Sequence, residues 1–227
     1  MDDTALTILR VADLLGVLGC ALLGGLVARQ RGFDPIGFAV LAVVSGLGGG
    51  IVRDVLLGQG APVALTDGTY FAVALTGAAV AYLIPLGGRI WSRGFPIVDA
   101  VALGCWAAAG TQKTLAYGHS WQTAVVLGTV TAVGGGVIRD LLIRQVPTVF
   151  GGNTLSVTPA ILAASTMVAF HAVGLTTVGL LACTAVGATL SLLAHHRHWT
   201  LPGALTPRWW GRPLRPRLRR SPRQPVG

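Results

Sequence analysis

The chain has 227 residues, of which 52% are apolar and only 11% are charged, which excludes an ordinary water-soluble domain of this size. A net charge of +9 could suggest nucleic-acid binding, but 8 of the 17 basic residues lie from Arg197 onward, and this concentration favours contact of the tail with anionic lipid. Cys20, Cys105 and Cys183 stand singly in apolar stretches, so the sequence predicts no metal site and no cofactor.

Seven apolar segments, each of a length that can span a bilayer, follow one another along the chain. They lie at roughly 5–28, 35–58, 67–87, 95–115, 120–143, 156–173 and 175–194. Gly, Pro and polar residues mark the breaks between them. Arginine follows the first, third, fifth and seventh segments, so the positive-inside rule places the N-terminus outside and the C-terminus in the cytoplasm. The sequence therefore predicts an all-α, multi-pass protein of the cell membrane with seven transmembrane helices.

An internal repeat relates the two halves of the chain. SGLGGGIVRDVL at 45–56 matches TAVGGGVIRDLL at 131–142 without a gap, and the same 86-residue shift takes Asp13 to Asp99. Because each copy contains three spans, an odd number, the second copy must enter the membrane inverted relative to the first. The predicted units are a first three-helix repeat at 5–87, a second, inverted repeat at 95–173, a seventh helix at 174–196 and a basic, disordered tail at 197–227.

Each copy carries three consecutive glycines, which are Gly48, Gly49 and Gly50 in the first and Gly134, Gly135 and Gly136 in the second. Each glycine costs a helix about 1 kcal/mol relative to alanine, so the triplets are expected to break or kink their helices. In lipid such a break is tolerated where it lines a cavity or a packed interface. The simpler interpretation of the triplets is close helix packing through small residues, but the presence of two matched triplets favours a functional role.

Six ionisable residues lie within the predicted spans, and they are Asp13, Arg53, Asp54, Asp99, Arg139 and Asp140. An arginine at membrane depth costs a few kcal/mol unless it is paired or reaches water. Neighbouring residues lie about 100° apart around a helix, so the arginine and aspartate of one motif are not expected to face each other. A charged network with acids from neighbouring helices is predicted instead.

Asp13 and Asp99 are the predicted partners of the motif arginines. Asp99 is favoured, because Arg10 can pair with Asp13 within one helix turn whereas the second copy has Pro96 in the place of Arg10. Snorkelling of the arginines to the interface and a purely structural buried salt bridge are the alternatives. Lys113, the one lysine, either lines a vestibule or snorkels from the outer end of its span.

Paired GGG-x-x-R-D motifs on the second and fifth of seven helices resemble the bacterial branch of the trimeric intracellular cation channel family, over roughly residues 5–195. The resemblance implies a homotrimer in which each subunit has its own ion path, lined by the first, second, fourth and fifth helices and kinked at the glycine triplets. It implies conduction of monovalent cations, notably potassium. Bacterial relatives with the same doubled domain are also described as glycine transporters. Animal members carry a lysine in the kinked helix that this chain replaces with Gly-Gly-Gly.

The sequence therefore favours a monovalent cation channel that passes the two glycine triplets, where exposed carbonyl dipoles can replace part of an ion's hydration shell. A secondary transporter of glycine or a similar small zwitterion is the alternative, and a membrane scaffold that transports nothing is a third. Nucleophile, general-base and phosphate-binding motifs are lacking, so no catalytic residue is expected and the chain is not predicted to be an enzyme.

Overall fold

The computed structural model describes residues 3–84, 89–150 and 155–200 of the chain. This part of the chain is entirely helical, with turns and irregular segments between the helices. The helices are α1 (Asp3–Gln30), α2 (Pro35–Leu57), α3 (Val63–Thr66), α4 (Gly68–Leu83), α5 (Arg89–Ala116), α6 (Trp121–Leu142), α7 (Val157–Ala172) and α8 (Thr176–Arg197). The predicted tail lies, from residue 201 onward, outside the described residues.

The seven longer helices coincide with the seven predicted segments, which confirms an all-helical membrane protein. Five of them, α1, α2, α5, α6 and α8, contain a stretch long and apolar enough to cross a membrane. α4 and α7 are apolar but have 16 residues each, which corresponds to about 24 Å of helix. The four-residue helix α3 was not predicted, because it lies within a loop that Gly and Pro residues punctuate.

Side-chain caps fix where several helices begin and end. Asp34 accepts a hydrogen bond from the backbone N–H of Gly37 at 2.7 Å, and Pro35 occupies the first turn of α2. α2 ends at Gly58, whose φ of 63° is in the left-handed region that glycine adopts readily. Ser120 caps α6 in the same way as Asp34 caps α2, by accepting from the N–H of Thr123. Both helices with glycine triplets, α2 and α6, therefore begin at a side-chain cap.

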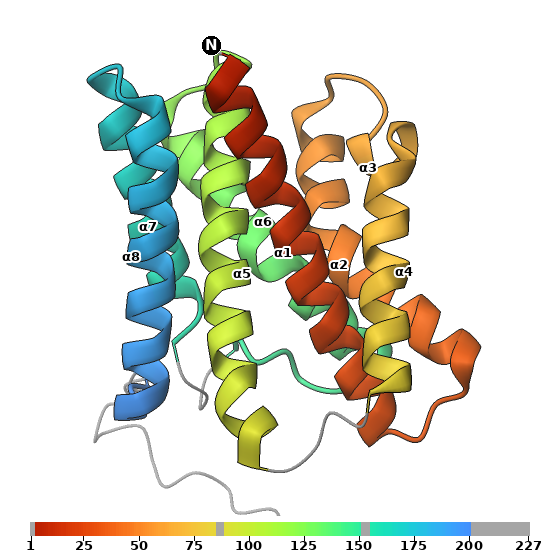
Figure 1. Cartoon of the computed structure of the whole chain (residues 1–227). Helices are drawn as coiled ribbons and strands as arrows, with labels where there is room; N and C mark the ends of the chain where they lie inside the picture. Colours follow the sequence, from red (N-terminus) through yellow and green to blue (C-terminus); the bar gives the residue numbers. More distant parts are fainter. Residues whose placement is uncertain (1–2, 85–88, 151–154, 201–227) are drawn as a thin grey trace, which may run out of the picture.

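The helices form one bundle in which α1 and α5 run side by side in opposite directions (Figure 1). α1 packs against α2 and α4, while α5 packs against α6, α7 and α8. α2 and α6 pack against each other in the middle of the bundle, and they join the two halves. The centre of the molecule is therefore built from α1, α2, α5 and α6.

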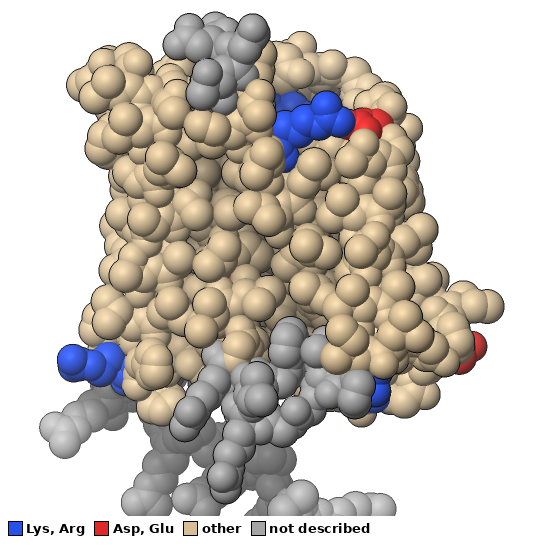
Figure 2. Space-filling view, in the orientation of Figure 1, with Lys and Arg blue, Asp and Glu red and all other residues tan. Residues whose placement is uncertain are grey.

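The surface of the bundle suits a lipid environment. Figure 2 shows one face on which charged side chains lie toward the two ends, with a wide band between them that carries none. Large apolar side chains are also exposed in the described part of the chain, and several of them are more than half exposed, including Ile36, Val126, Leu141 and Leu181. A water-soluble protein would not expose such a continuous apolar surface.

Candidate functional site

The two glycine triplets meet where α2 and α6 cross. A Cβ atom placed on Gly49 would overlap the carbonyl oxygen of Thr131, and one placed on Gly135 would overlap the carbonyl oxygen of Ser45. The 86-residue shift relates Gly49 to Gly135 and Ser45 to Thr131, so the two contacts are reciprocal. Reciprocity of this kind is what a two-fold axis through the crossing produces.

α2 and α6 are α-helical without interruption through both triplets, so the glycines end neither helix, and the predicted kink stays a prediction. Gly49 and Gly135 allow the backbones of α2 and α6 to approach closely, which supports a role in helix packing for these two glycines. Gly48 and Gly134 face the same crossing. Gly50 faces the indole of Trp106, and Gly136 lines a pocket.

Arg53 stands at the centre of a buried charged network near one end of the bundle. Its side chain is 2% exposed, and its Nε atom donates to Asp54 Oδ1 at 2.8 Å. Its Nη1 atom donates to Asp13 Oδ1 at 3.4 Å, which confirms Asp13 as a partner. Lys113 Nζ donates to Asp54 Oδ1 at 2.8 Å from α5. Two cations and two anions from three helices thus satisfy one another.

Tyr70 completes this network from α4, since its hydroxyl donates to Asp13 Oδ2 at 2.6 Å. We expect Tyr70→Phe to lower the free energy of unfolding by about 1.5–3 kcal/mol, because it removes a buried hydrogen bond to a charged group. Thermal unfolding of the detergent-purified protein, followed by size-exclusion chromatography, measures this change. Tyr82→Phe, at a side chain 45% exposed, is the matched control. Equal stability of the two variants would contradict a stabilising hydrogen bond between Tyr70 and Asp13.

Arg139 forms the corresponding contact in the second copy, at the other end of the bundle. Its Nη2 atom lies 2.8 Å and its Nε atom 2.9 Å from Asp140 Oδ1. Asp99 shares two cavities with Arg139, but no ion pair between them falls within 4.0 Å in the described part of the chain. The preference for Asp99 over Asp13 as an ion-pair partner is therefore wrong.

The geometry corrects two further expectations about the charges and decides between the two alternatives for Lys113. Arg and Asp of one motif do face each other, because the arginine side chain is long enough to curl around the helix to the next residue. Arg10 does not pair within its helix but with Asp67, at 2.7 Å. Lys113 does not merely snorkel, because it bonds Asp54 and lines two cavities.

The motif aspartates also anchor the loops that follow their helices. Asp54 Oδ2 accepts from the backbone N–H of Val63 at 2.9 Å, and Asp140 Oδ2 accepts from that of Thr148 at 3.2 Å. Each aspartate therefore connects its arginine to the chain eight or nine residues further on. The second oxygen of each carboxylate explains why an acid directly follows the arginine in both copies.

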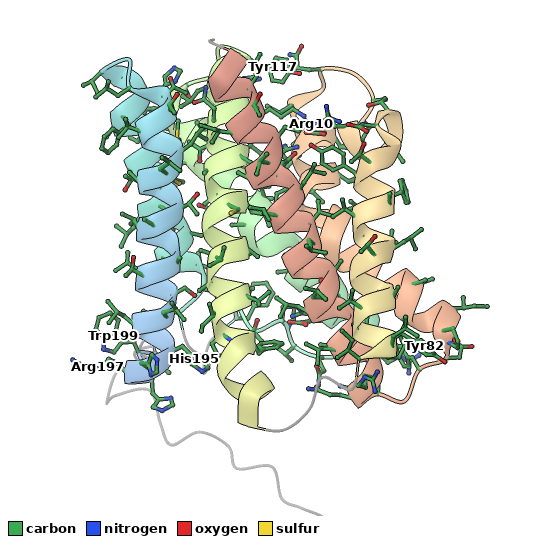
Figure 3. The ribbon with its side chains drawn as sticks, viewed as in Figure 1. Arg10, Tyr82, Tyr117, His195, Arg197 and Trp199 are labelled. Atoms are coloured by element: carbon green, nitrogen blue, oxygen red, sulfur yellow. The ribbon has the colours of Figure 1, made fainter. Side chains whose placement is uncertain are left out.

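Cavities open toward both ends of the bundle. The Arg53 cavity, of about 360 Å³, is lined by Arg10, Asp13, Arg53, Lys113, Tyr117 and apolar side chains. The Arg139 cavity, of about 210 Å³, is lined by Asp99, Arg139, Ser191, His195 and their neighbours. Figure 3 places Arg10 and Tyr117 at one end of the bundle and His195 at the opposite end. The two cavities therefore open on opposite sides of the apolar band.

A third, smaller space reaches from the Arg139 cavity toward the middle of the protein. This central pocket, of about 60 Å³, shares Asp99, Arg139, Thr148 and Ser156 with the Arg139 cavity. Its inner wall includes Cys20, Ser45 and Gly136. Ser45 is 2% exposed, and its hydroxyl has no hydrogen-bond partner among the described residues. The wall of the pocket thus includes, at the depth of the helix crossing, a residue whose buried hydroxyl has no hydrogen-bond partner among the described residues.

The structure brings together most of the residues that the sequence singled out, in two clusters joined by the α2–α6 crossing. Sequence reasoning missed Tyr70 and Ser45. Tyr70 contacts Asp13 only because α4 packs on α1, and no local pattern reveals this. Ser45 could have been found, because it is the first residue of the repeated SGLGGG segment and the equivalent residue, Thr131, also carries a hydroxyl.

Comparisons with known proteins agree with this geometry. A family model described as glycine transporter matches residues 10–85 and again residues 96–172, so it fits each half of the chain once. A UPF0126 membrane protein of Deinococcus radiodurans is 38% identical over 157 residues, which are 66% of this chain and 72% of the relative. A UPF0126 membrane protein of Vibrio cholerae is 35% identical over 151 residues, which are 65% of this chain and 63% of the relative.

Solved structures with the same fold are those of TRIC cation channels. A TRIC trimeric intracellular cation channel orthologue from Rhodobacter sphaeroides superposes with a TM-score of 0.80 at 28% identity, covering 85% of this chain and 100% of that one. A structure that describes conductance through TRIC cation channels gives a TM-score of 0.78 at 27% identity, covering 87% and 98%. The matched proteins are membrane proteins and channels, so the fold is TRIC-like and the chain is not an enzyme.

Proposed function

Because the chain belongs to the glycine transporter (UPF0126) family of multi-pass membrane proteins and has the fold of TRIC cation channels, we propose that it is a monovalent cation channel that conducts potassium. The observation that carries this proposal is the pair of charged cavities that face each other across the crossing of α2 and α6. The proposed path runs from the Arg53 cavity, past the glycine triplets, through the central pocket to the Arg139 cavity.

The balance of charge along this path supports cations as the permeant species. In the Arg53 network, Arg53 and Lys113 are matched by Asp13 and Asp54, so its formal charge is zero. Arg139 pairs with Asp140 and lines the Arg139 cavity together with Asp99, so the formal charge of these three residues is −1. The arginines therefore do not make the path positive, and acidic oxygens remain available at its Arg139 end.

The middle of the path offers oxygen atoms in place of charges. Ser45, whose buried hydroxyl has no partner among the described residues, lines the central pocket, and Gly136 adds no side chain to its wall. Hydroxyl and carbonyl oxygens are the groups that replace an ion's hydration shell in cation-selective pores. A weakly held, hydrated monovalent ion suits this lining better than an anion.

The wider arrangement that we propose follows from the repeat. Residues 5–87 and 95–173 would be inverted copies, an arrangement supported by the opposite directions of α1 and α5, and residues 174–196 would form an added helix. The N-terminus would lie outside the plasma membrane, with the basic tail at 197–227 in the cytoplasm on anionic lipid. Three copies would assemble as in the trimeric relatives, with one path in each.

Glycine transport is the second candidate, and the description of the matching family model favours it. A small zwitterion would place its carboxylate near Arg53 or Lys113 and its ammonium group near Asp13, all of which line the Arg53 cavity. Transport of this kind requires the central pocket to open alternately toward the two cavities.

Purified protein in liposomes distinguishes the two candidates. We expect potassium to flow down its gradient in the absence of an ionophore, at a rate that glycine does not change. Lys113→Met should alter this potassium flux, because it leaves Asp54 without one of its two cationic partners. Saturable uptake of radiolabelled glycine, with no potassium flux, would contradict the channel and support the carrier. Empty liposomes and liposomes with Trp121→Ala, at a side chain 60% exposed, are the controls.

A further inference from the structure

The Arg53 cavity and the central pocket do not share any lining residue, and a large buried side chain is attached to α5 between the residues that line the two spaces. That side chain is Trp106 of α5, which is 3% exposed and belongs to the buried cluster formed by α1, α2 and α4. No motif or spacing in the sequence singles out Trp106. Its neighbours on α5 and α1 define its position relative to the two spaces.

On α5, Leu103 lines the central pocket and Ala109 lines the Arg53 cavity. Trp106 lies three residues from each, and residues three apart share a face of a helix. On α1, Asp13 lines the Arg53 cavity and Cys20 lines the central pocket, with Gly16 between them against Trp106. Positions on both α1 and α5 thus place the indole between the Arg53 cavity and the central pocket.

The neighbouring helices accommodate the indole through glycines. A Cβ atom on Gly16 would lie 2.8 Å from Trp106 Nε1, and one on Gly50 would lie 3.2 Å from Trp106 Cη2. The ring therefore extends from α1 to α2, and both helices have a glycine where it touches them. Gly50 is the last glycine of the first triplet, so the indole reaches the same segment that the proposed path must pass.

The internal repeat places side chains of different size at equivalent positions of α1 and α5. The 86-residue shift takes Trp106 to Cys20, and Cys20 lies beside the indole. On the Arg139 side the small Cys20 side chain leaves room for the central pocket. On the Arg53 side the equivalent volume is filled by the largest side chain in proteins. The central pocket therefore adjoins the Arg139 cavity, with which it shares four lining residues, and shares none with the Arg53 cavity.

We propose that Trp106 is the barrier that closes the path between the Arg53 cavity and the central pocket, and that the indole must move for an ion to cross. This inference rests on the proposed function in so far as ions use the path. A constriction lined by an apolar ring excludes water, and exclusion of water is sufficient to stop an ion. Gly16 and Gly50 add no side chain that would hold the ring by interlocking with it.

Accessibility of Cys20 tests the barrier without any measurement of transport. In a chain with Cys105→Ala and Cys183→Ala, Cys20 is the single thiol, and a charged methanethiosulfonate reagent is added to membrane vesicles of either orientation. With Trp106 present, we expect labelling from the Arg139 end and only background labelling from the Arg53 end. Trp106→Ala should raise the rate from the Arg53 end several-fold. Trp106→Phe, which preserves more of the packing, should give a smaller rise.

Equal labelling from both ends with Trp106 present would overturn the proposal, as would no labelling from the Arg139 end or no rise in either Trp106 variant. Trp121→Ala, the exposed tryptophan at the start of α6, is the control and should change neither rate. Size-exclusion chromatography shows which variants remain folded.

Potassium flux in liposomes then separates the barrier from the channel. Several-fold faster flux in Trp106→Ala supports both. If Cys20 becomes accessible but no variant conducts potassium, the barrier stands and the proposed channel function fails. If the unaltered chain conducts potassium but Cys20 labelling and flux are unchanged in Trp106→Ala, the channel stands and the barrier is wrong.

Discussion

Gly49→Ala is expected to destabilise the protein by about 3 kcal/mol, at the upper end of the usual range for overpacking. The added methyl group would overlap the carbonyl oxygen of Thr131, and a backbone atom cannot turn aside as a flexible side chain can. α2 and α6 would have to separate along the whole crossing. For a chain of this size, the loss corresponds to a fall in melting temperature on the order of 6–12 °C, measurable by thermal unfolding in detergent.

Gly135→Ala should have the same effect, because its methyl group would meet the carbonyl oxygen of Ser45. Gly136→Ala is the matched control from the same triplet. Its methyl group would meet only Arg139 Nη2, at 3.7 Å, so its melting temperature should stay close to that of the unaltered chain. Similar stability of Gly49→Ala and Gly136→Ala would show that the crossing is looser than described.

Arg53→Met is expected to lower the free energy of unfolding by about 3–5 kcal/mol, because it removes the cationic partner of buried Asp13 and one of the two cationic partners of buried Asp54. Asp13 and Asp54 are 10% and 6% exposed in their side chains, so solvent cannot replace the guanidinium. Arg10→Met is the control, since the Arg10–Asp67 pair is exposed at its arginine and should contribute about 1 kcal/mol or less. Melting temperatures of the two variants measure the difference.

A second substitution tests whether the loss comes from the unpaired charge. Asp13→Asn in the Arg53→Met chain should recover part of the stability, because the carboxylate that lost its partner is then neutral. An additive loss from the two changes would mean that Arg53 stabilises the fold through its packing. Equal stability of Arg53→Met and Arg10→Met would contradict the buried network altogether.

The positions of the long helices could be predicted because apolar segments of sufficient length, and an ungapped repeat, are visible directly in the sequence. α1, α2, α5, α6 and α8 coincide with predicted segments within a few residues. The 86-residue shift also indicated that the two triplets belong together. It could not show that Gly49 and Gly135 touch each other's helices, since that depends on the angle at which α2 crosses α6.

The pairing of charges was less predictable because it depends on the conformations of long side chains. Directions of Cα–Cβ bonds separate Arg53 from Asp54, yet the guanidinium folds back to the adjacent carboxylate. Partners that come from distant helices, such as Tyr70 on Asp13 and Lys113 on Asp54, are 57 and 59 residues away in sequence. The position of Trp106 between two cavities is a property of the packed bundle, and no spacing in the sequence encodes it.

The central claim is that each subunit contains a continuous path for monovalent cations between the Arg53 and Arg139 cavities, and single-channel recording in a planar bilayer tests it most directly. With potassium chloride at different concentrations on the two sides, we expect discrete current steps that reverse near the potassium equilibrium potential. Gly49→Ala, where it remains folded, should change the unitary conductance. A bilayer that stays silent while the same preparation accumulates glycine in liposomes would contradict the claim.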